Sequence, residues 1–246
     1  MVVVRVFGLV LLLAAGVAAQ SRTPVIVELF TSEGCSSCPP ADSLLARLEQ
    51  YQPYQGIEVI ALGEHVDYWD HLGWRDRFSS ALFTARQQDY GRAFHLESVY
   101  TPQMVVNGQA QVLGSDQVQV QREIRNATQG PKARVDLSML STDTLRLKVD
   151  NLPAGTQTAD MLLAITESGL ETTVQSGENG GRQLRHTGVV RSIINLGRLD
   201  TKKASTYTAD AKLKLAPDWR RDNLKLVLFV QDRSTRRILG AGTLRP

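Results

Sequence analysis

The sequence predicts an α/β unit over residues 20–130, followed by an all-β unit over residues 131–246 in the form of an antiparallel sandwich. In the first unit, apolar runs of strand length alternate with segments whose apolar residues recur at helical spacing, in the order β-α-β-α-β-β-α. From Lys132 the pattern changes to short runs in which apolar and polar residues alternate. With 246 residues, of which 42% are hydrophobic, the chain is long enough to bury the cores of two units.

Residues 1–19 have the composition of a secretory signal peptide. One positive charge, Arg5, precedes an apolar run, and the small residues Val17 and Ala19 favour cleavage after Ala19. The alternative is an uncleaved anchor, but an apolar run of about 14 residues is short for a bilayer, which needs about 20. We therefore expect an exported protein, periplasmic or secreted, that has no membrane span after cleavage. The formal charge of +3, from 28 basic and 25 acidic residues, gives no sign of a nucleic-acid partner.

The first predicted strand, residues 25–30, is apolar except for Glu28, as expected for a strand buried on both faces of a parallel sheet. Downstream, residues 41–51 carry apolar side chains at helical spacing and predict a helix. The chain's two cysteines, Cys35 and Cys38, therefore occupy the strand-to-helix turn and the first helical turn. Two prolines directly after Cys38 suit a first helical turn, where amide donors are not needed.

The remaining elements of the first unit follow from similar patterns. A second apolar strand over residues 57–62 precedes a polar and aromatic stretch and then a helix over residues 77–94. The dipeptide Asn107-Gly108 between two strand-like runs predicts a β-hairpin. Ser115 is a candidate cap for a last helix, which ends at Gly130-Pro131.

Beyond residue 131, short alternating runs separated by turn signals predict the strands of the all-β unit. In one clear run, Leu145, Leu147 and Val149 alternate with polar residues, which is typical of a strand with one face in solvent. Several such runs within about 115 residues suggest an antiparallel sandwich.

Four blocks of sequence, in this order, resemble one known family. They are "VELFTSEGCSSCPPAD", "HVDYWDHLGW", "TPQMVVNG" and "GENGGRQLRHTGVVR". A strand, then C-x-x-C opening a helix, and later a Thr-Pro before a hairpin, is similar to the thioredoxin fold. Together the four blocks resemble the DUF1223 family of bacterial secreted thioredoxin-like proteins, whose function is poorly defined, over nearly all of the mature chain.

Three interpretations of the pair Cys35 and Cys38 remain open: a redox couple, a structural disulfide and part of a metal site. Amide donors and the positive end of the helix dipole favour a thiolate at a helix start, so Cys35 is the expected nucleophile. Cys38, one turn later, is placed to resolve a mixed disulfide. The adjacent Glu33 would oppose thiolate formation. A disulfide that closes only four residues would contribute about 2 kcal/mol at most.

The resemblance adds two expectations near the cysteines. Thr101-Pro102 matches the position of the cis-proline of thioredoxin-like proteins, where a cis bond exposes backbone groups for pairing with a partner; an ordinary trans proline is the alternative. Glu28 resembles in position the buried acid of thioredoxins, although the residue type and the offset differ, and it would exchange a proton with Cys38. A solvated or ion-paired glutamate is the alternative.

The segment after the second strand supplies further candidates for substrate binding. The carboxyl ends of neighbouring parallel strands share a crevice, so we expect His65, Asp67 and Trp69 near Cys35. His65 would stabilise a thiolate and Trp69 would form an apolar wall for a partner. The alternative is an aromatic loop packed on the core.

The late glycine-rich block, residues 177–191, is open to two interpretations. It is either a hairpin loop without a chemical role or a loop that reaches the first unit. In the second case the side chains available for polar contacts are Glu178, Asn179, Arg182 and His186.

The sequence thus predicts an exported thiol-disulfide exchange protein that acts on protein thiols or disulfides through Cys35 and Cys38. This chemistry requires no organic cofactor and no metal. An alternative is a periplasmic copper-handling protein, because Cu(I) suits two thiolates, and Met104 or His65 would add a third ligand. A third interpretation is a non-catalytic interaction module on the same scaffold.

Overall fold

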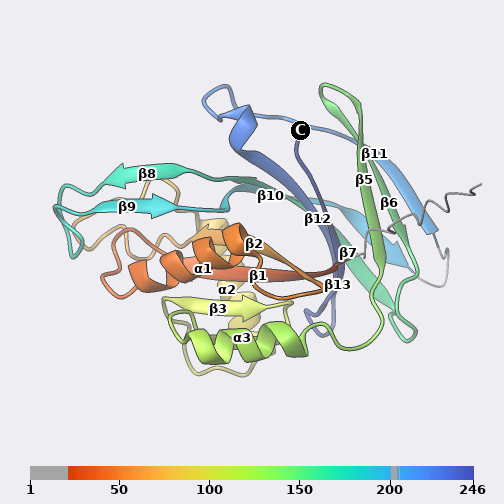
Figure 1. Ribbon diagram of the computed structural model, residues 1–246, viewed down its shortest axis with the longest axis horizontal. Coiled ribbons are helices and arrows are strands. Elements are labelled where there is room, and N and C mark those ends of the chain that lie inside the picture. Colours follow the sequence, from red (N-terminus) through yellow and green to blue (C-terminus); the bar gives the residue numbers. More distant parts are fainter. Residues whose placement is uncertain (1–21, 201–203, 205) are drawn as a thin grey trace, which may run out of the picture.

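The computed structural model describes residues 22–200, 204 and 206–246, so the predicted signal peptide, residues 1–19, lies outside the described residues. The chain forms a mixed α/β structure that is dominated by one large sheet and has few helices (Figure 1). No helix in these ranges is long and apolar enough to cross a membrane.

The first half of the chain contains its elements in the predicted order. They are β1 (Thr23–Thr31), α1 (Pro39–Tyr51), β2 (Ile57–His65), α2 (Ala81–Ala93), β3 (Gln103–Val106), β4 (Ala110–Leu113) and α3 (Gln117–Asn126). β1 pairs in parallel with β2 on one side and antiparallel with β3 on the other, and β3 pairs with β4. These strands therefore lie side by side in the order β2-β1-β3-β4.

Alternate residues of β1 face helices on the two sides of the sheet. Val27 and Leu29 pack with α1 and α3, whereas Ile26 packs on the other face with α2. Because β1 and β2 are parallel, with Thr31 opposite His65, both strands end at the same edge of the sheet. The turn from β1 to α1 is therefore next to the loop that follows β2.

Two helices begin at positions other than those that the sequence predicts. α2 begins at Ala81, later than expected, because the hydroxyl of Ser80 caps it. α3 is capped by Asp116, whose carboxylate accepts a hydrogen bond from the amide of Gln119, and not by Ser115. Aspartate satisfies a free amide of the first turn as well as serine does, so the residue types alone do not show whether Ser115 or Asp116 caps the helix.

The second half of the chain is built of strands, apart from a 3-10 turn at Arg221–Asn223, within the residues described. The strands are β5 (Arg134–Ser141), β6 (Thr144–Asp150), β7 (Thr158–Glu167), β8 (Leu170–Thr173), β9 (Gln183–His186), β10 (Val189–Asp200), β11 (Thr206–Lys212), β12 (Leu224–Asp232) and β13 (Ile238–Leu244). β5, β6 and β11 form a second sheet, and β8 and β9 form a separate hairpin. Residues 174–182, which connect β8 to β9, are called the β8–β9 loop below.

The large sheet contains strands from both halves of the chain, although the sequence suggests a boundary between two units at residues 130–131. Over the described ranges its eight strands have the order β13-β12-β7-β10-β2-β1-β3-β4. The two halves join where Val189 of β10 lies opposite Gly63 of β2, and the amide of Gly63 donates a 2.7 Å hydrogen bond to the carbonyl of Gly188. Gly188 has φ +62°, and a Cβ atom there would lie 2.7 Å from the carbonyl oxygen of Ala61, so this close approach requires glycine.

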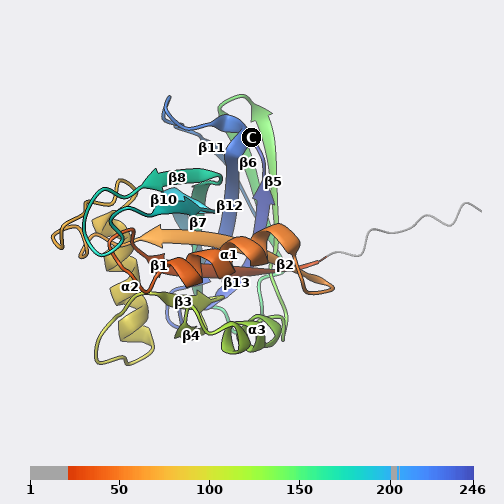
Figure 2. The same cartoon turned by 60° about the vertical axis from the view of Figure 1, so that its left-hand side comes forward.

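The second sheet packs on the large sheet through a hydrophobic core. In β6, Leu145, Leu147 and Val149 are buried, while the arginine and lysine between them are exposed. The buried side chains pack with Leu163 of β7 and Leu228 of β12. At the other end of the large sheet, the β8–β9 hairpin lies along α1, as both views show (Figures 1 and 2).

Candidate functional site

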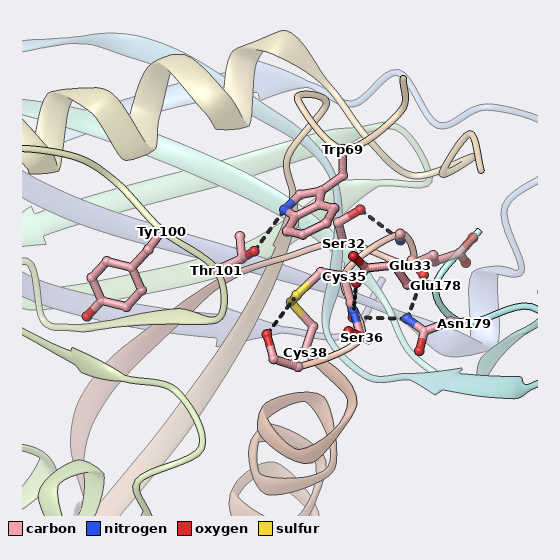
Figure 3. Close-up of a disulfide and its surroundings, with 12 residues drawn as sticks. Ser32, Glu33, Cys35, Ser36, Cys38, Trp69, Tyr100, Thr101, Glu178 and Asn179 are labelled. Atoms are coloured by element: carbon pink, nitrogen blue, oxygen red, sulfur yellow. Dashed lines mark hydrogen bonds between the residues drawn. A yellow bond between two sulfur atoms is a disulfide. The ribbon is translucent and has the colours of Figure 1, made fainter. Parts of the chain in front are cut away.

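The disulfide between Cys35 and Cys38 lies in the turn that connects β1 to α1 (Figure 3). The Cα atoms of the two cysteines are 5.4 Å apart, and both side chains are buried, whereas Ser36 between them is exposed. Cys38 is the N-cap of α1, and its carbonyl oxygen accepts hydrogen bonds from the amides of Ala41 and Asp42. The pair therefore stands at the helix start, where the sequence predicts it.

Pro102 lies close to the first turn of α1. The Thr101–Pro102 peptide bond is cis, as predicted. The carbonyl oxygen of Pro102 accepts a 2.9 Å hydrogen bond from the amide of Gly114. A Cβ atom on Gly114 would lie 3.1 Å from the Cβ of Ala41 in α1 and 3.3 Å from the Cβ of Pro102. The missing side chain of Gly114 thus lets the cis-proline and the helix that carries Cys38 pack closely.

Trp69, which follows β2, covers the cysteine turn. Its indole Nε1 donates a 2.9 Å hydrogen bond to the hydroxyl of Thr101, and a Cβ atom on Gly34 would lie 3.3 Å from the Trp69 Cβ. Figure 3 shows the indole above the disulfide, with Thr101 at its edge. Asp67 points elsewhere, because its carboxylate accepts a 2.6 Å hydrogen bond from the hydroxyl of Thr84 in α2. The structure brings Trp69 to the disulfide and ties Asp67 to α2.

Glu33, two residues before Cys35, is fully buried and has polar partners from distant segments. Its carboxylate accepts a 2.8 Å hydrogen bond from the indole Nε1 of Trp74 and lies 3.1 Å from Nε2 of His186. Its amide donates a 2.9 Å hydrogen bond to the carboxylate of Asp76. A buried carboxylate without partners is costly, so these contacts are what allow Glu33 to lie in the turn.

His65 ends β2 and forms a cluster of rings with Phe78 and His186. The ring centroids of His65 and His186 are 5.0 Å apart, and Phe78 lies 5.4 Å from one and 5.5 Å from the other. Nδ1 of His65 lies 2.6 Å from the carboxylate of Asp76. Burial works to lower the pKa of His65, but the charge and hydrogen bond of Asp76 outweigh it and raise that pKa. Burial likewise works to raise the pKa of Asp76, and the charge of His65 with several hydrogen bonds lowers it. The two side chains form a buried ion pair.

The β8–β9 loop closes over the cysteine turn (Figure 3). Asn179 is fully buried, and its side-chain amide donates hydrogen bonds to the carbonyl oxygens of Glu33, at 2.8 Å, and Cys35, at 2.9 Å. The carboxylate of Glu178 accepts a 3.0 Å hydrogen bond from the amide of Ser36. The sequence left open whether this loop reaches the first half of the chain, and the structure shows that it does.

The β8–β9 loop is itself held in place. Arg182 donates a 2.9 Å hydrogen bond to the side-chain oxygen of Asn179, and the hydroxyl of Ser176 donates one of 2.5 Å to the carbonyl of Gly73. Gly177 has φ +73°, and a Cβ atom there would lie 3.1 Å from the Cβ of Trp74. The loop is therefore fixed against the segment between β2 and α2 as well as against the cysteine turn.

Glu28 is buried, but its partners are on α2, on the face of the sheet opposite α1. One carboxylate oxygen lies 2.5 Å from Nε of Arg86, and the other accepts a 2.6 Å hydrogen bond from the hydroxyl of Tyr90. Glu64 of β2 lies 3.5 Å from the same Arg86 nitrogen, and burial, reinforced by the charge of Glu28, raises the pKa of Glu64 well above its ordinary value. Glu28 is thus in an ion pair, the alternative that the sequence left open, and it faces away from the helix that follows the cysteines.

Some residues of this arrangement carry no clear signal in the sequence. Asp76 follows the aromatic stretch after β2, but nothing in its spacing indicates an ion pair with His65. A glutamate in an apolar strand implies a cationic partner for Glu28, yet α2 contains both Arg86 and Arg92. The helix pattern alone does not show that Arg86 is the one that faces the sheet.

A cavity of about 540 Å³ lies between α2 and β10, where β10 diverges from β2 after the pair at Val189. Its walls include Arg77, Arg191 and Trp219. Phe78 lines this cavity and also contacts the two histidine rings. The cavity therefore borders the histidine cluster, while neither cysteine lines it.

Within residues 22–200, 204 and 206–246, no group of three or more histidine, cysteine, aspartate or glutamate residues is arranged to hold a metal ion. Met104 is fully buried in the core with α1 and α3. His65 is engaged with Asp76 through Nδ1. Both side chains that the sequence offers as a third copper ligand thus have other contacts.

The chain matches one family model and resembles several solved structures. The family described as "Protein of unknown function (DUF1223)" matches residues 26–231. A crystal structure of a protein from Agrobacterium tumefaciens is 29% identical, with a TM-score of 0.72, over 92% of this chain and 96% of that one. A domain of the outer membrane lipoprotein Omp28 from Porphyromonas gingivalis is 12% identical, with a TM-score of 0.25, over 47% of this chain and 88% of that one. No curated protein matches the chain.

Proposed function

The chain belongs to the DUF1223 family, whose function is unknown, and we propose that it is an exported thioredoxin-like protein that exchanges disulfides with protein thiols through Cys35 and Cys38. The observation that carries this proposal is the place of the disulfide, at the start of α1 and close to the cis peptide bond of Pro102. The strand order β2-β1-β3-β4, with α1 and α3 on one face and α2 on the other, supports the thioredoxin-like part of the proposal.

The exchange proceeds in two steps. A thiolate of the partner attacks Sγ of Cys35, the Cys35–Cys38 bond breaks, and Cys38 leaves as a thiolate that takes up a proton. A second thiol of the partner then loses its proton and attacks the mixed disulfide, which releases Cys35 as a thiolate and leaves the partner oxidised. In the reverse direction, the Cys35 thiolate attacks a partner disulfide and Cys38 resolves the product.

The groups around the disulfide support Cys35 as the sulfur that the partner attacks and Cys38 as the leaving thiolate. The carbonyl of Cys38 is fixed in the helix by two amides, while Ser36 and Ser37, which follow Cys35, are exposed. The hydroxyl of Ser37 lies 3.3 Å from Sγ of Cys35. A partner therefore approaches over these serines, with Trp69 and Thr101 forming one wall of its path. Because the cysteines are buried in the oxidised protein, the covering groups have to move before the sulfur is attacked.

The export part of the proposal rests on residues 1–19 and on the disulfide, because thiols outside the cytosol stay oxidised more readily than those inside it. Amino-terminal sequencing of the mature protein tests it. We expect the mature chain to begin at Gln20 and to be recovered outside the cytosol. An intact amino terminus in the cytosolic fraction would contradict this part alone.

Equilibration with glutathione, followed by mass-spectrometric trapping of the thiols, tests the exchange reaction. We expect a reversible couple between about −120 and −270 mV, the range of exchange proteins. In Cys38→Ser, Cys35 is expected to accumulate as a mixed disulfide with glutathione, whereas Cys35→Ser, the matched control, does not form one. A pair that stays oxidised well below about −300 mV is a structural disulfide, and the proposal then fails.

A further inference from the structure

Five titratable side chains form a buried or half-buried cluster beside the cysteine turn. They come from both halves of the chain and are Glu33, Asp42, His65, Asp76 and His186. The pair of His65 and Asp76 is closed by a 2.6 Å contact, and the pair of His186 and Glu33 by one of 3.1 Å. Glu33 connects this cluster of proton-binding groups to the disulfide, because it precedes Cys35 by two residues.

His186 has one ring nitrogen that faces a carboxylate and one that is buried without a partner in the described part of the chain. Its Nε2 faces the carboxylate of Glu33, which accepts but does not donate, so in the neutral ring the proton is on Nε2. Its Nδ1 is buried and has no hydrogen-bond partner among the described residues. A cavity of about 10 Å³ lies between Asp42, His65 and His186, roughly the space of one water. A proton can thus be added at Nδ1 without breaking the bond to Glu33.

Reduction changes the charge of the turn that Glu33 occupies. The two electrons that break the disulfide produce two thiolates, and at least one of them takes up a proton. A thiolate left on Cys35 adds a negative charge two residues from Glu33, whose carboxylate is buried, and like charges in a region of low dielectric repel each other. A cation formed beside Glu33 would offset this repulsion.

We propose that His186 takes up a proton at Nδ1 when the Cys35–Cys38 disulfide is reduced, so that the Glu33–His186 pair balances the charge of the Cys35 thiolate. The partner dithiol supplies two electrons to the disulfide. Two protons are taken up, one by Cys38 and the other by His186, while Cys35 remains a thiolate. The second half of the chain then sets the reactivity of Cys35. This use of His186 rests on the proposed function.

The charged groups around His186 are consistent with this assignment. Asp42 on α1 and Glu33 in the turn face it as acids, and His65 faces it as a base already paired with Asp76. Phe78 contacts His186 and also the two nearby cations, because the guanidinium carbons of Arg77 and Arg191 lie 4.6 Å and 5.4 Å from its ring centroid. Since Asp76 is already the counter-charge of His65, His186 is the imidazole of the cluster whose charge we expect to change on reduction.

Nuclear magnetic resonance of the histidine rings tests the proposal on the unaltered protein. The ring signals of all four histidines, assigned in isotope-labelled protein, are titrated with the cysteines oxidised and again with them reduced by a phosphine. We expect the titration of His186 to move upward by about one pH unit on reduction, equivalent to a tenfold change in proton affinity. The exposed His71 and His95 serve as internal controls and are expected not to move.

His186→Asn provides the second measurement, with His71→Asn as the matched control. We expect the alkylation rate of Cys35 in the reduced protein to fall about tenfold at pH 7 in His186→Asn and to stay unchanged in His71→Asn. The proposal is overturned if His186 titrates at the same pH in both redox states, and this test does not depend on the folding of any variant. If His186 responds to the phosphine but glutathione does not equilibrate with the cysteines, the exchange function fails while the proton linkage stands.

Discussion

The side-chain amide of Asn179 lies 2.9 Å from the carbonyl oxygen of Cys35, although 144 residues separate them in the sequence. The same nitrogen lies 2.8 Å from the carbonyl oxygen of Glu33. One buried side chain of the second half thus satisfies two carbonyl groups of the cysteine turn. The geometry of that turn depends on the β8–β9 loop as well as on α1.

Asn179→Ala is expected to loosen the cysteine turn. Two buried carbonyl groups lose their donor, so we expect the free energy of unfolding to fall by about 1–3 kcal/mol. We also expect dithiothreitol to reduce the disulfide faster, because the covering loop is less firmly held. Urea denaturation and reduction kinetics measure the two effects. Asn126→Ala, at the exposed end of α3, is the control, and equal reduction rates in the two variants would contradict the covering role of the loop.

Glu178→Gln is expected to make reduced Cys35 more reactive. The hydrogen bonds that Glu178 accepts from Ser36 lower the pKa of Glu178, so its carboxylate is charged at neutral pH. Removing this charge beside the turn favours the Cys35 thiolate, and we expect faster alkylation at pH 7. The difference is expected to shrink in high salt, because the group is exposed. Glu97→Gln, also exposed, is the control; an equal acceleration in both variants would show a general charge effect instead.

Asp76→Asn is expected to destabilise the protein most in mildly acidic solution. The raised pKa of His65 contributes stability below its ordinary value of 6.5 that is lost as the pH rises through the higher folded value. The lowered pKa of Asp76 contributes stability above its ordinary value of 3.8 that is lost as the pH falls through the lower folded value. The pair is therefore strongest between about pH 4 and 6.5.

Denaturation midpoints at pH 5.5 and pH 9 measure this effect. At the lower pH we expect Asp76→Asn to cost about 3–5 kcal/mol, the usual effect of removing one partner of a buried pair. The cost should be smaller at the higher pH, where His65 is closer to neutral. Asp70→Asn, in the same loop but not bonded to a histidine, is the comparison; a cost that does not depend on pH would show that the ion pair is not the cause.

Arg86→Leu is expected to lower stability without changing the chemistry of the disulfide. It leaves the buried carboxylate of Glu28 without its cation, so we expect a loss of about 3–5 kcal/mol. Glu28 and Arg86 lie on the face of the sheet opposite α1, so the rate of disulfide reduction in the folded variant is expected to match that of the unaltered protein. Arg92→Leu, on the exposed side of α2, is the control for both measurements. A changed reduction rate in folded Arg86→Leu would restore a role for Glu28 at the cysteines.

Local patterns in the sequence were sufficient for the elements that carry the disulfide. An apolar strand, two cysteines and a helix with regular apolar spacing predict β1, the turn and α1, because the periods of strands and helices are local properties. The alternation of Leu145, Leu147 and Val149 predicts a strand with one buried face for the same reason. The family resemblance supplied the cis bond before Pro102, which composition does not show.

The tertiary structure decided which of these residues meet. The sequence shows that Glu28 is in an apolar strand, but only the packing of α2 on that face pairs it with Arg86 and turns it away from α1. The sequence marks the segment that holds Asn179, but only the hairpin of β8 and β9 brings it to Cys35. Such contacts join residues far apart in the chain, so they depend on how the sheets assemble and leave no period in the sequence. The sequence therefore determined where the two cysteines are, and the assembly of the two halves decided what surrounds them.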